Sequence, residues 1–194
     1  MARRMAHVAI PSAPLTAAGH ARATLSLGLP LIGSHLAQIA LHVTDTIMLG
    51  WYGVLALASG VLGATMFFVL FILGAGFAKA VMPLVASAMG QGDEVQVRRV
   101  TRMGLWLSIL FGIAIYPVFW WSEGLLLALG QAPEVAALAG RYMQIAGLGM
   151  IPALLVMTLK SYLAALGRTQ VQLWVTLAAV GVNAALNWAL IFGN

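Results

Sequence analysis

The sequence predicts an all-α protein that crosses a membrane several times. Its 194 residues are 62% hydrophobic and only 8% charged, whereas soluble domains carry about 25% charged residues. Mean hydropathy is +0.97, and five long apolar stretches follow one another with no soluble domain between them. A helix needs roughly 20 apolar residues to cross a bilayer. We therefore expect a polytopic bundle of membrane helices.

The charge balance and residue usage exclude several other classes. Ten Lys and Arg stand against five Asp and Glu, but most of the basic residues lie beside or between apolar stretches. There they orient the chain and contact lipid headgroups, so we expect the lipid bilayer and no nucleic acid as a partner. The absence of cysteine excludes disulfides and thiolate chemistry. No HExxH, GxSxG or Walker motif is present, so we expect no enzyme.

The spans are expected in order after a short tail. Residues 1–24 contain Pro11 and Pro14 and have no long apolar core, which predicts a cytoplasmic amino-terminal tail. Residues 25–194 are predicted to form the bundle. Its second span exceeds 20 residues by far and should tilt or project from the membrane, and Pro152 predicts a kink in the fourth. The five spans are expected at about 25–50, 55–89, 100–121, 135–166 and 170–192.

The basic residues also predict the orientation. If the spans alternate, all the loops rich in arginine fall on one side of the membrane, and the opposite loops hold Glu123 and Glu134 but no Lys or Arg. The positive-inside rule then places the amino terminus in the cytoplasm. The arginines concerned are Arg3, Arg4, Arg22, Arg98, Arg99, Arg102 and Arg168.

A polar face in the first span predicts a binding site. His35, Gln38, His42 and Asp45 fall within an arc of roughly 80° on an ideal helix. An ionised carboxylate in a membrane helix costs about 3 kcal/mol or more unless it faces protein or water. We therefore expect a lined cavity with Asp45 as its main group. The alternative is a carboxylate solvated at the headgroups, and the histidines could relay protons or simply pack against a neighbouring helix.

The fifth span carries a second polar face. Gln172, Thr176, Asn183 and Asn187 fall within an arc of roughly 60°. The two asparagines, four residues apart, offer neighbouring carbonyl acceptors and amide donors. They could line the same cavity as Asp45, or they could hydrogen-bond between helices without a further role.

Four motifs resemble the multidrug and toxin extrusion (MATE) family of transporters. Asp45-Thr-Ile-Met-Leu-Gly50 resembles the family's D-T-x-M-x-G motif in the first helix, and Pro83 to Asp93, PLVASAMGQGD, resembles the end of its second helix. SYLAALGRTQ, from Ser161 to Gln170, is similar to the joint before the fifth helix, and the run from Asn183 to Gly193 is similar to that helix. Ser87 stands where many relatives have glutamine, and Asn187 is closer to the NorM-like branch than to the branch with aspartate there.

The resemblance implies a secondary antiporter of two six-helix lobes. Such proteins export cationic or amphipathic drugs and toxins in exchange for Na⁺ or H⁺ across a bacterial-type inner membrane, without another cofactor. It implies a cation-coupling site at Asp45, with Asn183, Asn187 and Gln38 as further ligands. Na⁺ at Asp45 is the only metal expected. His35, His42, Gln172 and Thr176 are weaker candidates for the substrate cavity.

The length of the chain predicts part of a lobe, because only about five of the six helices are present. We expect a truncated amino-terminal lobe that works with the missing carboxyl-terminal lobe of the same transporter. Two alternatives remain open at this point. One is a flippase for lipid-linked oligosaccharides in the same superfamily, although its cavity would favour basic residues. The other is a membrane scaffold subunit that transports nothing.

Overall fold

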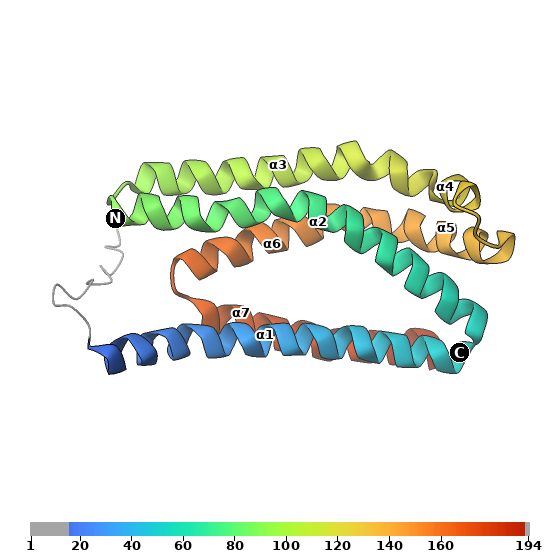
Figure 1. The fold of residues 1–194 in the computed structure, drawn as a ribbon, viewed down its shortest axis with the longest axis horizontal. Coiled ribbons are helices and arrows are strands. Elements are labelled where there is room, and N and C mark those ends of the chain that lie inside the picture. Colours follow the sequence, from blue (N-terminus) through green and yellow to red (C-terminus); the bar gives the residue numbers. More distant parts are fainter. Residues whose placement is uncertain (1–15, 193–194) are drawn as a thin grey trace.

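The computed structural model describes residues 16–192, and the side chains of Asn187 and of residues 190–192 lie outside that description. The described part is a membrane-type helix bundle, as the sequence predicts (Figure 1). Four of its helices are long and apolar enough to cross a membrane, or five when one bent pair counts as a single span. The helices are α1 (Ala17–Tyr52), α2 (Val54–Gly90), α3 (Glu94–Trp120), α4 (Ser122–Ala128), α5 (Pro133–Leu148), α6 (Met150–Ala165) and α7 (Thr169–Phe192).

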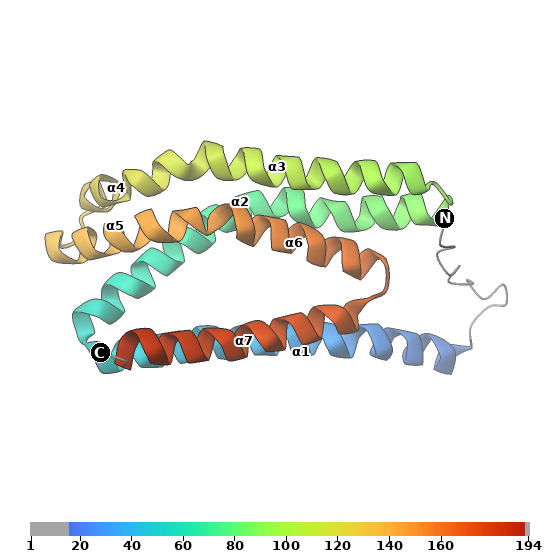
Figure 2. The same cartoon turned by 180° about the vertical axis from the view of Figure 1, so that it is seen from behind.

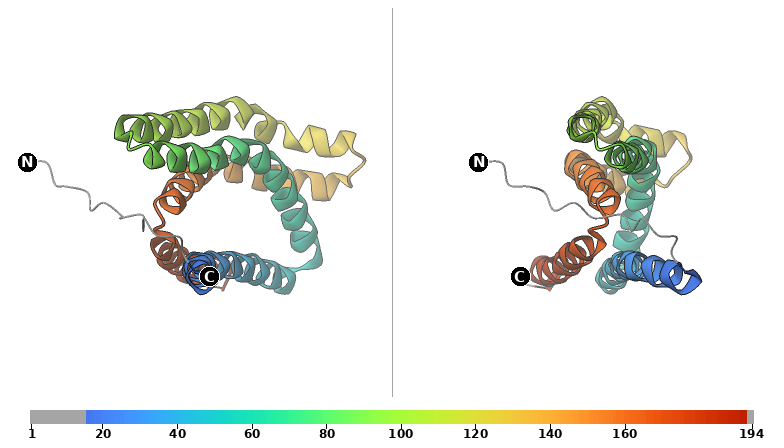
Figure 3. Two further views of the ribbon diagram at one scale, coloured as in Figure 1. Left: turned by 60° about the vertical axis from the view of Figure 1, so that its left-hand side comes forward. Right: turned by 90° about the vertical axis from the view of Figure 1, so that its left-hand side faces the viewer.

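The helices form two parts. In one, α2, α3, α5 and α6 pack together with α4 at one end, and we call these five helices the bundle. In the other, α1 and α7 lie side by side and run in the same direction, and we call them the pair (Figures 1 and 2). The pair joins the bundle through contacts of α1 with α2 and of α7 with α6. Figure 3 shows the two parts connected by the first half of α2 and by the turn between α6 and α7.

Two of the recognised motifs end helices. Gly92 in MGQGD and Gly167 in LGRT have φ of 71° and 69°, in the left-handed region that favours glycine. After α6, the N–H of Arg168 donates to the carbonyl of Leu163 at 2.9 Å. The N–H of Gly167 donates to the carbonyl of Ala164 at 3.0 Å, and this bond completes a Schellman cap. The motif glycine therefore stops α6 and allows the chain to turn into α7.

The bundle has a dry apolar core. Phe119, Met143, Met150 and Leu154 are fully buried and pack together, with side chains of α2 around them. Glycines allow the helices to approach closely, because a Cβ at Gly74 would lie 2.7 Å from the Phe111 ring. The buried hydroxyls of Ser108 on α3 and Thr158 on α6 bond each other at 3.0 Å. Polar groups in this part therefore satisfy one another.

Three elements differ from the sequence expectation. Residues 17–24, expected in the tail, belong to α1, because the Thr16 hydroxyl accepts from the N–H of Gly19 at 3.3 Å and caps an alanine-rich first turn. Residues 122–128, expected in a loop, form α4. The fourth span is broken into α5 and α6, which meet at an angle of 49°. Pro152 lies in the first turn of α6 and has no N–H for the Leu148 carbonyl, so the kink predicted there is observed.

Candidate functional site

The contact between Gly33 and Leu173 sets the register of the pair. A Cβ at Gly33 would lie 3.1 Å from Cδ1 of Leu173, so this leucine rests on α1 at that point. The two helices run in parallel (Figure 2). At about 1.5 Å per residue, Asp45 lies about 18 Å along α1 from this contact, and Asn183 lies about 15 Å along α7. The carboxylate and the carboxamide are therefore at nearly the same depth, on neighbouring helices.

Burial agrees with this placement for part of the expected site. Asp45, Gln38 and Asn183 are half-buried, which is the exposure of side chains at the edge of a helix contact. Asn187 follows Asn183 by one turn on α7, about 3 Å beyond the depth of Asp45. Its side chain lies outside the described residues. Asp45 and Gln38 thus lie on α1, and the two asparagines lie on the neighbouring helix α7. We call the contact between these two helices the seam.

Tyr142 on α5 is a neighbour of this seam that the sequence did not single out. Its ring packs on Gly63 of α2, where an added Cβ would lie 3.1 Å from Cε1 of the ring. The charge of the Asp45 carboxylate acts on its hydroxyl. The polar cluster Arg141, Tyr142 and Gln144 within the fourth span is the sequence signal that could have found Tyr142. Asp45 and Tyr142 are therefore close enough to interact electrostatically.

The two histidines of the expected site do not share the half-buried environment of Asp45. His35 and His42 are exposed, and His42 lines a shallow apolar groove on α1 with Ile39, Val43 and Ile47. An ideal helix separates His42 from Asp45 by about 60°, which agrees with the exposure of His42 and the half-buried state of Asp45. The polar face of the first span thus contains two half-buried residues, Gln38 and Asp45, and two exposed histidines.

Gln172 and Thr176, in contrast to the two histidines, lie inside the protein. Both are buried, with 8% and 5% of their surface exposed. Within the described chain, Gln172 Oε1 and Thr176 Oγ1 are the buried side-chain atoms that have no hydrogen-bond partner. They lie on the start of α7, which packs against α1 and α6. Gln172 and Thr176, two of the weaker candidates for the cavity, therefore have buried oxygens without partners among the described residues.

The donor set favours a hard monovalent cation or a proton. The described residues contain no group of three or more His, Cys, Asp and Glu side chains that could hold a transition metal. The seam instead offers one carboxylate and carboxamide oxygens, which suit a hard ion such as Na⁺. A single carboxylate can equally take up a proton.

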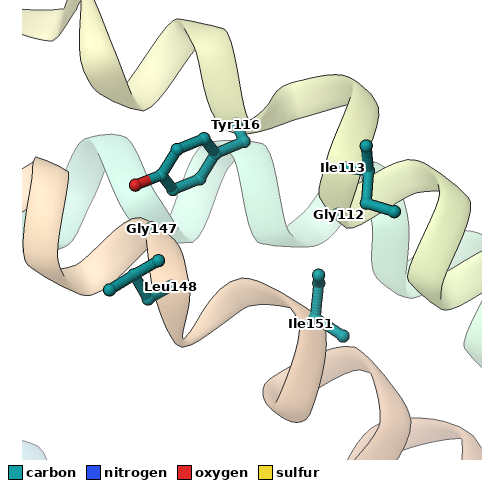
Figure 4. Close-up of a pocket in the computed structure, with 6 residues that line it drawn as sticks. All are labelled: Gly112, Ile113, Tyr116, Gly147, Leu148 and Ile151. Atoms are coloured by element: carbon teal, nitrogen blue, oxygen red, sulfur yellow. The ribbon is translucent and has the colours of Figure 1, made fainter.

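A separate opening lies at the break between α5 and α6. Figure 4 shows Tyr116 and Ile113 of α3 opposite Leu148 and Ile151, with glycines on both sides. The opening has a volume of about 230 Å³, and the Tyr116 hydroxyl is the only side-chain polar group among its lining residues. It contains none of the expected site residues. The bend of the span, rather than a polar site, accounts for this space.

Comparisons with known proteins agree with the motifs. The MatE family model matches residues 30–189. A probable multidrug resistance protein NorM of Rhizobium meliloti is 50% identical over 90% of this chain and 38% of its own length. The corresponding protein of Agrobacterium fabrum is 44% identical over 95% of this chain and 40% of its own. The chain thus spans about two fifths of the length of these relatives.

A solved structure has the same fold. It is a MOP superfamily transporter from Pyrococcus furiosus, similar with a TM-score of 0.78 and 19% identity over 89% of this chain and 38% of that one. The apolar helices and the NorM relatives identify a multi-pass membrane protein. The family resemblance predicted from the four motifs is confirmed: the chain belongs to the MatE family.

Proposed function

We propose that this chain forms most of one lobe of an ion-coupled exporter of cationic or amphipathic drugs and toxins. Its relatives in the MatE family are named as probable multidrug resistance proteins, and Na⁺ or H⁺ would drive the export. The observation that carries the proposal is the half-buried Asp45 of α1, at nearly the depth of Asn183 on the neighbouring α7. A second lobe of the same transporter would complete the substrate pathway.

The proposed mechanism uses the Asp45 carboxylate as the site where the ion binds. Bound Na⁺ or a proton neutralises a charge that is costly to keep between membrane helices. An ion drives transport only if it binds one conformation more tightly than the other. Gln38, Asn183 and Asn187 would supply further oxygens in the conformation in which α1 and α7 are close. Release of the ion would restore the negative charge and attract a cationic substrate.

The orientation proposed from the arginines has support in the fold. The start of α1, the turn between α2 and α3, and the turn between α6 and α7 all lie at the same end (Figure 1). Arg98 and Arg99 follow the turn between α2 and α3, and Arg168 lies in the turn between α6 and α7. We assign this end to the cytoplasm, because the opposite loops contain no Lys or Arg.

The test is drug export by a full-length transporter that contains this chain. Asp45→Asn keeps the shape of the side chain but removes its charge and its titration, so ethidium efflux should fall to the level of cells without the transporter. Asp93→Asn is the matched control: Asp93 caps α3 by accepting from the N–H of Gln96 at 2.9 Å, and asparagine caps equally well. Efflux by the Asp45 variant at the control level, with equal expression, would refute the mechanism.

A further inference from the structure

Thr176 is an exception among the helical hydroxyls. Ser34, Thr44 and Thr65 donate to the carbonyl four residues earlier at 2.9, 2.9 and 2.7 Å. Such bonds satisfy a hydroxyl inside an apolar helix without any other partner. Thr176 is buried and makes no such bond, although the same kind of carbonyl is available to it. The Thr176 hydroxyl oxygen is therefore not bonded to the carbonyl four residues earlier.

Gln172 leaves a second oxygen in the same place. The two residues are one turn apart on α7 and share a face. A carbonyl acceptor and a hydroxyl at this spacing can be bridged by one water, which donates to Gln172 and accepts from Thr176. Buried polar groups without protein partners are the usual sites of internal water. Because α7 packs against α1 and α6, such a water would lie between these helices.

Polar residues lie on both sides of this point. Thr169, 3% exposed, precedes Gln172 at the start of α7, on the side away from Asp45. Counted along the helices from the contact of Gly33 with Leu173, Gln38 of α1 lies about 3 Å beyond Thr176. Asn183 lies about 8 Å beyond Gln38, and Asp45 about 3 Å farther still. One water molecule can bridge the steps of about 3 Å, whereas the step of about 8 Å needs a side chain together with water.

We propose that Gln172 and Thr176 hold buried water, and that this water begins a hydrated path along the seam of α1 and α7 to Asp45. The path starts at the end of the lobe where Arg168 precedes α7. It would let the coupling ion exchange between Asp45 and the solution at that end, and this role rests on the proposed function of Asp45. The titratable groups at the end of the path near Asp45 are Asp45 itself, His42 of α1 and Tyr142 of α5.

The chain has no cysteine, so single cysteines can report water in the seam. A small charged methanethiosulfonate reacts with thiolates, which require water around the sulfur. In membrane vesicles, Thr176→Cys should react at least about tenfold faster than Thr158→Cys, whose side chain is fully buried and bonded to Ser108 in the dry bundle. Equal rates for the two variants would overturn the proposal.

A third variant tests whether the cysteine substitutions have separated α1 from α7. Leu173→Cys lies on the same helix, three residues before Thr176, where the leucine packs on Gly33. Leu173→Cys should react slowly with the reagent, because the contact of this residue with Gly33 is apolar. If Leu173→Cys reacts as fast as Thr176→Cys, the substitutions have separated the helices and the proposed local water site is wrong.

Transport then tests the connection to Asp45. In the full-length transporter, Gln172→Leu combined with Thr176→Val should slow ion-driven efflux several-fold, because the apolar side chains remove the water. Unchanged efflux would overturn the path. Labelling does not depend on transport, so fast labelling of Thr176→Cys together with normal efflux by Asp45→Asn would retain the water site and reject the coupling role of Asp45.

Discussion

The bundle and the pair treat buried polar groups in opposite ways. In the bundle, Ser108 and Thr158 bond each other between α3 and α6, and Ser122 donates to the Phe119 carbonyl at 2.8 Å. In the pair, Gln172 and Thr176 are also buried, but Gln172 Oε1 and Thr176 Oγ1 have no partner among the described residues. An unsatisfied buried group costs about 1–3 kcal/mol. Such groups persist where something other than protein binds them, which suits the part that holds Asp45.

The two parts also differ in how closely their helices meet. Glycines in the bundle lie against ring atoms and branched side chains of neighbouring helices, as Gly74 does against Phe111 and Leu154. In the pair, Gly33 meets only the flexible end of Leu173. We infer that the bundle is the rigid part, whereas the pair can adjust its contact. An ion site that must change between two conformations is better placed in the adjustable part.

Gly74→Ala should have the largest effect on stability. The new Cβ would lie 2.7 Å from the Phe111 ring and 2.9 Å from Leu154, and overpacking of a tight core costs about 1–3 kcal/mol. The unfolding temperature of the protein in detergent, followed by circular dichroism, measures the loss. Gly76→Ala is the control, because nothing lies within 4 Å of its Cβ position. Equal unfolding temperatures for both variants would show that the bundle is not tightly packed.

Ser108→Ala should have an intermediate effect. It leaves the fully buried Thr158 hydroxyl without its partner, at a cost of about 1–2 kcal/mol. Replacing both residues, by Ser108→Ala with Thr158→Val, should restore much of the lost stability because no unsatisfied group remains. The same melting experiment, run on both variants, measures the recovery. A double variant less stable than Ser108→Ala would mean that the hydroxyls matter through packing.

Gly33→Ala should have the smallest effect. Its Cβ would meet Leu173 Cδ1 at 3.1 Å, and the end of a leucine can rotate away, so we expect a change within about 0.5 kcal/mol. Gly28→Ala on the same helix, with nothing within 4 Å, provides the reference. A loss comparable to that of Gly74→Ala would contradict the inference that the pair adjusts more easily than the bundle.

Helical periodicity predicted which polar residues share a face of a helix, but not which of them are buried and which are exposed. Helical spacing grouped Asp45, Gln38 and the histidines on one face of the first span, and it grouped Gln172 with Asn183 on the fifth. It could not show that His35 and His42 are exposed whereas Asp45 is half-buried. Nor could it bring Tyr142 near Asp45. Both depend on residues more than 90 positions away in the chain.

The sequence by itself determined the membrane helices, the family and the turns. Apolar length decides what can cross a bilayer, and glycines such as Gly92 and Gly167 decide where helices end, and both are local properties. Only the tertiary structure decided which polar residues meet. The parallel register of α1 and α7, marked where Leu173 rests on Gly33, puts Asn183 at nearly the depth of Asp45. The packing of α7 leaves Gln172 Oε1 and Thr176 Oγ1 buried without partners among the described residues. Contacts between distant segments depend on how whole helices pack, and no local pattern encodes that.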